Sequence, residues 1–192
     1  METQIYTING KEQERNGPWL QTFSGGRFWP LDPRVEDIRI EDITWSLAKI
    51  CRYGGHTKFF YSVGQHCVLG SRVVQDRTQD PKQALAFLLH DASEAYLLDM
   101  LRPLKRLPDF QFYKFLERSC MGVIGEKFSV TFDYPIIKEV DNQLLFTERR
   151  DLMVNCWEWE HEVAPLNETI LPWTWQEAGD RFTQQFADLT NV

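Results

Sequence analysis

Two histidines and two aspartates in this sequence have the types and spacing of a metal site. They are His66, the adjacent pair His90 and Asp91, and Asp141. Imidazole nitrogens and carboxylate oxygens form a mixed donor set that suits Mn, Fe, Co, Ni or Zn better than Ca. Because His90 and Asp91 point about 100° apart on a helix, they share an ion only if it lies between their two faces. His66 and Asp141 would then complete the shell from neighbouring helices.

Each of these residues also has an ordinary explanation. A lone histidine on an apolar helix face is more often a core residue with a satisfied hydrogen bond, and His-Asp dipeptides arise often by chance. Spacing alone therefore leaves both interpretations open, and the surrounding sequence must decide between them.

Helical periodicity dominates the segments that carry these residues. Asp80 before Pro81 is a typical helix start, and Thr174 with Glu177 has the pattern of a capping box. Alternating β-branched residues over a useful length are nearly absent, so the sequence predicts an all-α fold, a compact multi-helix bundle. The predicted helices cover residues 40–50, 63–74, 81 past Asp91 toward Leu98, 112–124, 135 toward Trp157, and 174–189, with an irregular segment over 1–39 and a loop over Leu101–Pro108.

Composition describes one globular domain with an acidic balance. The chain has 192 residues, 43% of them hydrophobic, and a formal net charge of −7. An acidic protein is a poor binder of nucleic-acid polymers and anionic membranes. We also expect no membrane span, because no apolar run is long enough, and no secretory signal, because no cationic start is followed by an apolar stretch and a small-residue cleavage site. The four cysteines, which we expect to be buried reduced thiols of a cytoplasmic protein, are Cys51, Cys67, Cys120 and Cys156.

The context of the histidines follows an ordered pattern. The first histidine closes the segment Ser62–His66, and Leu88–Asp99 reads LLHDASEAYLLD, with Glu94 three residues after Asp91. With these features the chain resembles the HD-domain metal-dependent phosphohydrolases, and among them the small 5′-deoxyribonucleotidases and phage dATP triphosphohydrolases. Further parts of the pattern are Pro103 and Lys105 after Asp99, the late aspartate in Lys138–Asp141, and the segments Ile50–His56, Tyr61–Val63 and Thr147–Leu152.

The resemblance covers roughly residues 22–155 and implies a single HD-type domain over 1–192, with a Trp-rich loop and helix over 156–192. The chain departs from the family pattern at three places. Leu98 stands where the family often has glycine before Asp99, and Gln65 precedes the first histidine where bacterial nucleotidases carry glutamate. The tryptophan that screens the sugar in some relatives has no obvious counterpart, and Tyr53 stands near the corresponding place.

The resemblance also implies a chemistry. His66, His90, Asp91 and Asp141 would bind one divalent transition metal (Co, Mn or Zn), and metal-activated water would attack the α-phosphorus of a deoxyribonucleotide. A monophosphate would yield nucleoside and phosphate, and dATP would yield deoxyadenosine and triphosphate. Two alternatives remain open: a phosphodiesterase acting on cyclic or short oligonucleotides, and a non-catalytic HD protein that binds nucleotide or a partner protein.

Several side chains would act on the substrate. Glu94, one helical turn from the ligand pair, is the expected general acid or base, and its alternative is a surface partner for a cation. Phe28, Trp29 or Tyr53 could stack on a base, although each could equally pack in the core. The expected substrate-binding residues are Arg52, Tyr53, His56, Lys58, Asp99 and Lys105. We expect a homo-oligomer, because tryptophans such as those near the C-terminus are enriched at subunit interfaces.

Overall fold

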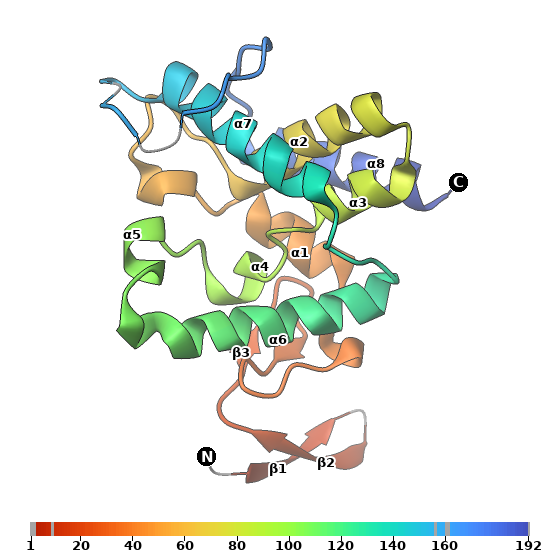
Figure 1. Ribbon diagram of the computed structural model, residues 1–192. Helices are drawn as coiled ribbons and strands as arrows, with labels where there is room; N and C mark the ends of the chain where they lie inside the picture. Colours follow the sequence, from red (N-terminus) through yellow and green to blue (C-terminus); the bar gives the residue numbers. More distant parts are fainter. Residues whose placement is uncertain (1–2, 9, 156, 160–161, 192) are drawn as a thin grey trace.

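Eight α-helices account for about half of the chain described by the computed structural model, which covers residues 3–8, 10–155, 157–159 and 162–191 (Figure 1). The protein is therefore mostly helical and compact, as the sequence predicts. The helices are α1 (Ile40–Leu47), α2 (Val63–Thr78), α3 (Pro81–Leu88), α4 (Glu94–Leu97), α5 (Arg102–Lys105), α6 (Gln111–Phe128), α7 (Pro135–Leu152) and α8 (Trp175–Thr190).

Local signals place the starts of two helices. The Asp80 carboxylate accepts a hydrogen bond from the Lys82 backbone N–H at 2.9 Å, and Pro81 opens α3 as predicted. The Thr174 hydroxyl and the Glu177 carboxylate exchange hydrogen bonds with each other's backbone N–H groups, so the predicted capping box of α8 is present.

The core lies where α2 packs against α3, α7 and α8. Gly70 allows the closest approach, because a Cβ atom there would lie 2.0 Å from the ring of Phe87 on α3. Leu144 of α7 and Phe182 of α8 are fully or almost fully buried against the same cluster. The core therefore fixes the relative positions of the helices that carry the histidines.

The N-terminal segment is not irregular, contrary to the prediction. Strands β1 (Thr3–Ile8) and β2 (Lys11–Asn16) form an antiparallel hairpin, and β3 (Leu20–Gln21) pairs with β4 (Arg27–Phe28). The first hairpin projects from the end of the molecule opposite α7 (Figure 1).

A buried charge attaches that hairpin to the body. The guanidinium group of Arg15 lies over the Trp29 ring and donates to the Asp37 carboxylate at 2.7 and 2.9 Å. Arg15 is fully buried. Because the contact depends on an ion pair rather than on an apolar stripe, hydrophobic periodicity carries no sign of it.

The helix predicted over residues 81–98 is interrupted. α3 ends at Leu88, the chain continues through turns, and α4 starts at Glu94. The Phe87 carbonyl accepts from the backbone N–H of His90 at 3.3 Å and from its ring Nδ1–H at 2.7 Å. This carbonyl is therefore engaged by the residue three positions later, which ends the regular α-helical ladder.

Two other predicted boundaries differ. Residues 101–108 contain α5, with Pro103 in its first turn, followed by a 3₁₀ helix that starts at Pro108. Proline is compatible with a first helical turn, so its presence there did not exclude a short helix.

α7 ends at Leu152 instead of running toward Trp157. The returning chain occupies its C-terminal end, because Arg150 donates to the Leu166 carbonyl at 2.7 Å and the Asp151 carboxylate accepts from the Ile170 N–H at 2.8 Å. These contacts exist only in the folded chain and leave no local signal.

Two expectations about the chain as a whole can be compared with the structure. Over the described ranges no helix is both long and apolar enough to cross a membrane. Cys51, Cys67 and Cys120 are free thiols, as predicted. Cys67 and Cys120 are buried, but Cys51 is only half-buried, contrary to the prediction, and Cys156 lies outside the described residues.

Candidate metal centre

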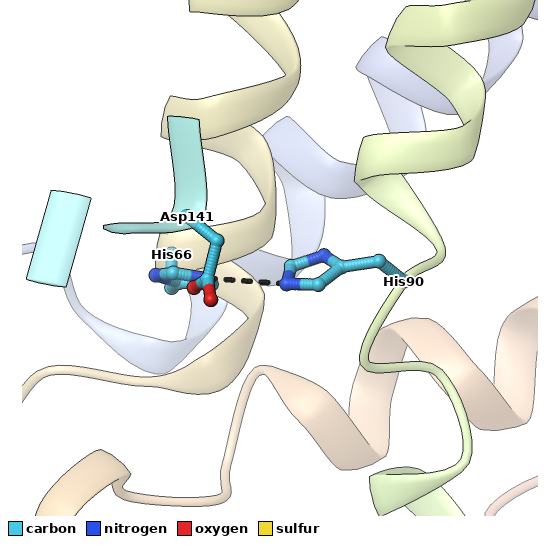
Figure 2. Close-up of side chains that lie close together, drawn as sticks. All are labelled: His66, His90 and Asp141. Atoms are coloured by element: carbon cyan, nitrogen blue, oxygen red, sulfur yellow. Dashed lines mark hydrogen bonds and ion pairs between the residues drawn. The ribbon is translucent and has the colours of Figure 1, made fainter. Parts of the chain in front are cut away.

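The four predicted ligands come together between α2, α7 and the turn after α3. His66 Nε2 lies 3.4 Å from His90 Nε2, 3.4 Å from Asp141 Oδ1 and 3.8 Å from Asp91 Oδ2. Figure 2 shows the rings of His66 and His90 and the Asp141 carboxylate facing a common point. The donor atoms of these three lie within 4.8 Å of one another, so the group could hold a metal ion.

The break after α3 allows adjacent residues to share this point. Asp91 Oδ2 lies 3.3 Å from His90 Nε2, although neighbouring side chains on a continuous helix diverge. The turn therefore brings the two side chains to one point. On a continuous helix they could share an ion only if it lay between the two faces.

Hydrogen bonds orient both imidazoles toward the cluster. His90 Nδ1 donates to the Phe87 carbonyl at 2.7 Å, and His66 Nδ1 donates to Glu148 Oε1 at 2.6 Å. With each Nδ1 turned to its acceptor, both Nε2 atoms face the two carboxylates. Two nitrogen and two carboxylate donors at this spacing fit a divalent metal.

Glu148 is the buried anchor of this arrangement. Besides His66, its carboxylate accepts from Tyr61 OH at 2.9 Å, from Arg52 Nη2 at 3.2 Å and from Tyr53 OH. Burial raises the pKa of Glu148, but Arg52 and His66 outweigh that effect and hold the pKa at about 2. Glu148 is therefore an anion that fixes His66 from behind.

Sequence reasoning assigned no role to Glu148, although a signal existed. Glu148 follows Asp141 by seven residues, which is two helical turns, so both carboxylates lie on one face of α7. It also lies in the segment Thr147–Leu152 that contributed to the family resemblance.

Arg52 connects the anchor to the ligands. It is buried in a 3₁₀ turn, and its Nη1 donates to Asp91 Oδ2 at 3.4 Å. The next residue, Tyr53, has a φ of 57° and directs its hydroxyl to Glu148. Tyr53 therefore holds the anchor, a role that the sequence did not indicate.

Glu94 is buried beside the cluster at the start of α4. Its Oε1 lies 3.8 Å from Lys105 Nζ, and its Oε2 has no hydrogen-bond partner among the described residues. Burial first, and then the Asp91 and Asp99 charges, raise the pKa of Glu94 well above its ordinary range. Lys105 also pairs with Glu117 of α6 at 2.8 Å. The sequence expected Glu94 on a continuous helix with the ligand pair; it reaches the site through a turn instead.

Asp99 follows a strained turn. Leu98 has φ 69° and ψ 157°, a region that only glycine adopts without cost, and its side chain is 66% exposed. Tyr113 of α6 donates to the Leu98 carbonyl at 2.7 Å and holds the turn. The turn occurs where the resembled family often has glycine, so the chain keeps the backbone shape without that residue. Burial raises the pKa of Asp99.

A cavity of about 530 Å³ adjoins the cluster. Its lining includes three of the predicted substrate-binding residues, Arg52, Tyr53 and Asp99. It also includes Arg102, Phe146 and Trp159, to which the sequence assigned no substrate contact. Arg102 Nη2 also lies 3.2 Å from Asp141 Oδ2. Two side chains that line the cavity, Arg52 and Arg102, therefore contact two carboxylates of the donor set, Asp91 and Asp141.

Other candidates lie elsewhere. Lys58 donates to the Asp151 carbonyl at 3.2 Å at the end of α7, and His56 is exposed in the turn after Gly55; neither lines the cavity. Phe28 stacks on Tyr96, and Trp29 contacts Tyr6 and Arg15. Phe28 and Trp29 therefore pack within the protein.

The fold and this cluster define the class as a mostly helical protein with a buried group of imidazoles and carboxylates able to hold a metal ion. No family model matches the chain. The chain is 39% identical over 183 residues to the uncharacterized protein YfdR of Escherichia coli K12, an alignment that covers 91% of this chain and 97% of YfdR. It therefore belongs to the YfdR family. Over 91 residues it is 40% identical to the uncharacterized protein RCAP_rcc00048 of Rhodobacter capsulatus, covering 45% of this chain and 46% of that protein.

Proposed function

We propose that this protein is an HD-domain phosphohydrolase that cleaves the 5′-phosphate ester of deoxyribonucleotides. The observation that carries the proposal is the convergence of His66, His90, Asp91 and Asp141 on one point, beside a buried Arg52 and a buried Glu94. A donor set of two imidazoles and two carboxylates suits Co, Mn or Zn. When bound, such a cation lowers the pKa of water and offsets charge on phosphoryl oxygens.

Two arginines supply the phosphate contacts. Arg52 and Arg102 lie next to different carboxylates of the donor set, at 3.4 Å from Asp91 and 3.2 Å from Asp141. Each guanidinium group has further N–H donors in a planar fork that matches phosphoryl oxygens. A phosphate seated at the cluster is thus held from two sides, which compensates for the acidic balance of the whole protein.

Glu94 handles the proton in this proposal. Its Oε2 is buried without a partner among the described residues and is free to accept a proton from water or donate one to the leaving 5′ oxygen. The Lys105 ammonium group, with Nζ 3.8 Å from Oε1 of Glu94, supplies a positive charge beside this carboxyl group. Asp99, at the lining of the cavity, accepts a hydrogen bond from a sugar hydroxyl.

The test is a metal and substrate panel. Metal-stripped protein is reloaded with Co, Mn or Zn and incubated with deoxy- and ribonucleoside monophosphates, dATP and cyclic nucleotides, and the release of phosphate or triphosphate is measured. We expect release from a deoxyribonucleotide, abolished in Asp141→Asn and retained in Asp133→Asn, whose side chain is exposed before α7. Hydrolysis of cyclic nucleotides alone, or no hydrolysis by fully loaded protein, would contradict the proposal.

A further inference from the structure

The cavity beside the cluster has two chemically different kinds of lining. Arg52 and Arg102, which contact Asp91 and Asp141, line it together with Phe146 of α7 and Trp159. Phe146 follows Asp141 by five residues, which is about 7.5 Å along a helix axis at a rise of about 1.5 Å per residue. That separation is comparable with the span from a 5′-phosphate to its base.

Trp159 is held in place by two neighbours on α7. Its ring meets Phe146 edge to face at 6.1 Å, and the Arg149 guanidinium lies 5.6 Å from the ring centre. Leu101 and Leu145 add apolar lining. A flat ring in an apolar wall offers a stacking surface, and stacking accepts any base because every base has a π face.

Glu158 adds a polar group to this wall. It lines the same cavity, and its carboxylate has no hydrogen-bond or ion-pair partner among the described residues. An ionised carboxylate only accepts hydrogen bonds. Guanine presents an N–H and an amino group side by side, whereas thymine presents one N–H between two carbonyl oxygens that repel a carboxylate.

We propose that this cavity is the base-binding subsite of the active site, with Trp159 as its stacking residue and Glu158 favouring guanine over thymine. The inference rests on the proposed function for its choice of a nucleotide as ligand. The segment that supplies both residues lies beyond the region that resembles HD-domain enzymes.

The test measures equilibrium binding of 2′-deoxyguanosine and thymidine by calorimetry, so that neither phosphate nor turnover enters the readout. We expect Trp159→Leu to bind 2′-deoxyguanosine about 10-fold more weakly than the wild type. Trp159→Phe should keep most of the affinity. The matched control is Trp157→Leu, because Trp157 is 79% exposed and does not line the cavity. Unchanged binding by Trp159→Leu, or an equal loss in Trp157→Leu, would overturn the assignment.

The Glu158→Gln variant tests the base preference. We expect the ratio of 2′-deoxyguanosine to thymidine affinity to fall at least several-fold, and an unchanged ratio would remove Glu158 from the proposal. The two proposals fail separately. Nucleoside binding that depends on Trp159, without hydrolysis of any nucleotide, refutes the enzyme and leaves the subsite. Hydrolysis with nucleoside binding indifferent to Trp159 refutes the subsite and leaves the enzyme.

Discussion

Asp141 and Glu148, two turns apart on α7, contact opposite nitrogens of the same imidazole. Asp141 Oδ1 lies 3.4 Å from Nε2 of His66, and Glu148 Oε1 lies 2.6 Å from Nδ1. One face of α7 therefore carries both the candidate ligand Asp141 and Glu148, which orients the neighbouring candidate ligand His66. This separates the groups that would touch an ion from those that orient the ligands.

Glu148→Gln should weaken metal binding without removing any ligand. The amide cannot balance the Arg52 charge or accept as strongly from His66, and loss of such an outer hydrogen bond costs about 10- to 100-fold in metal affinity. Breaking the buried ion pair should also lower the unfolding free energy by about 3 kcal/mol. Competition with a chelator and urea denaturation measure the two effects. Glu139→Gln, on an exposed part of α7, is the control; equal metal affinity in both variants would remove Glu148 from the site.

Glu94→Gln should retain the metal and lose most turnover. The amide keeps the shape of the side chain but cannot accept and release a proton, and general acid–base catalysis contributes about 10²- to 10⁴-fold. The checks are metal content per chain and kcat on the substrate found in the panel. A kcat close to that of the wild type would exclude Glu94 from the chemistry.

Lys105→Ala should raise KM for a nucleotide while leaving metal content unchanged. Lys105 lies 3.8 Å from Glu94 and is not within the donor set. Steady-state kinetics of the metal-loaded variant, with metal content measured on the same sample, give both values. An unaltered KM would show that Lys105 acts only on the fold, through Glu117.

Leu98→Gly should stabilise the protein. Relief of a positive φ is worth about 1–2 kcal/mol, and the added freedom of glycine in the unfolded chain costs about 0.5–1 kcal/mol. Since Leu98 is largely exposed, little burial is lost, and the unfolding free energy should rise by about 0.5–1 kcal/mol. Leu97→Gly, at the helical residue before it, should do the opposite. A lower melting temperature for Leu98→Gly would mean that the turn is not strained.

Gln65, which stands where the resembled bacterial nucleotidases carry glutamate, holds a distant part of the chain. Its amide donates to the Leu171 carbonyl at 2.7 Å and accepts from the Trp173 N–H at 3.3 Å, so two hydrogen bonds attach the segment before α8 to α2. Gln65→Glu removes the donor and buries a charge, and should cost about 1–3 kcal/mol of unfolding free energy. Unchanged stability in urea would contradict this role.

Helical periodicity was sufficient to predict α2 and α7, which carry His66 and Asp141. Residue types and spacing alone left the shared site open, and only the resemblance to HD-domain enzymes favoured it. Caps such as Asp80 and Thr174 act locally, so their effect is visible in the sequence. The turn after α3 could not be predicted from the sequence, because it depends on the Phe87 carbonyl accepting two hydrogen bonds from His90.

The parts that escaped prediction depend on distant contacts. The β1–β2 hairpin is attached through buried Arg15, and the wall of the cavity depends on the path that brings Trp159 back to Phe146. Neither leaves a periodic or local pattern. Glu148 lies between these cases, since its seven-residue spacing from Asp141 was visible but a carboxylate in a helix is usually a surface group.

Titration of metal-stripped protein with Co²⁺, followed by calorimetry and by the visible absorption of the ion, shows whether the four side chains share one ion. We expect one ion per chain, with binding abolished or at least 100-fold weaker in both His90→Asn and Asp141→Asn, and unchanged in Asp133→Asn. Binding that survives in the two ligand variants, or no binding to the wild type, would contradict a shared ion at His66, His90, Asp91 and Asp141.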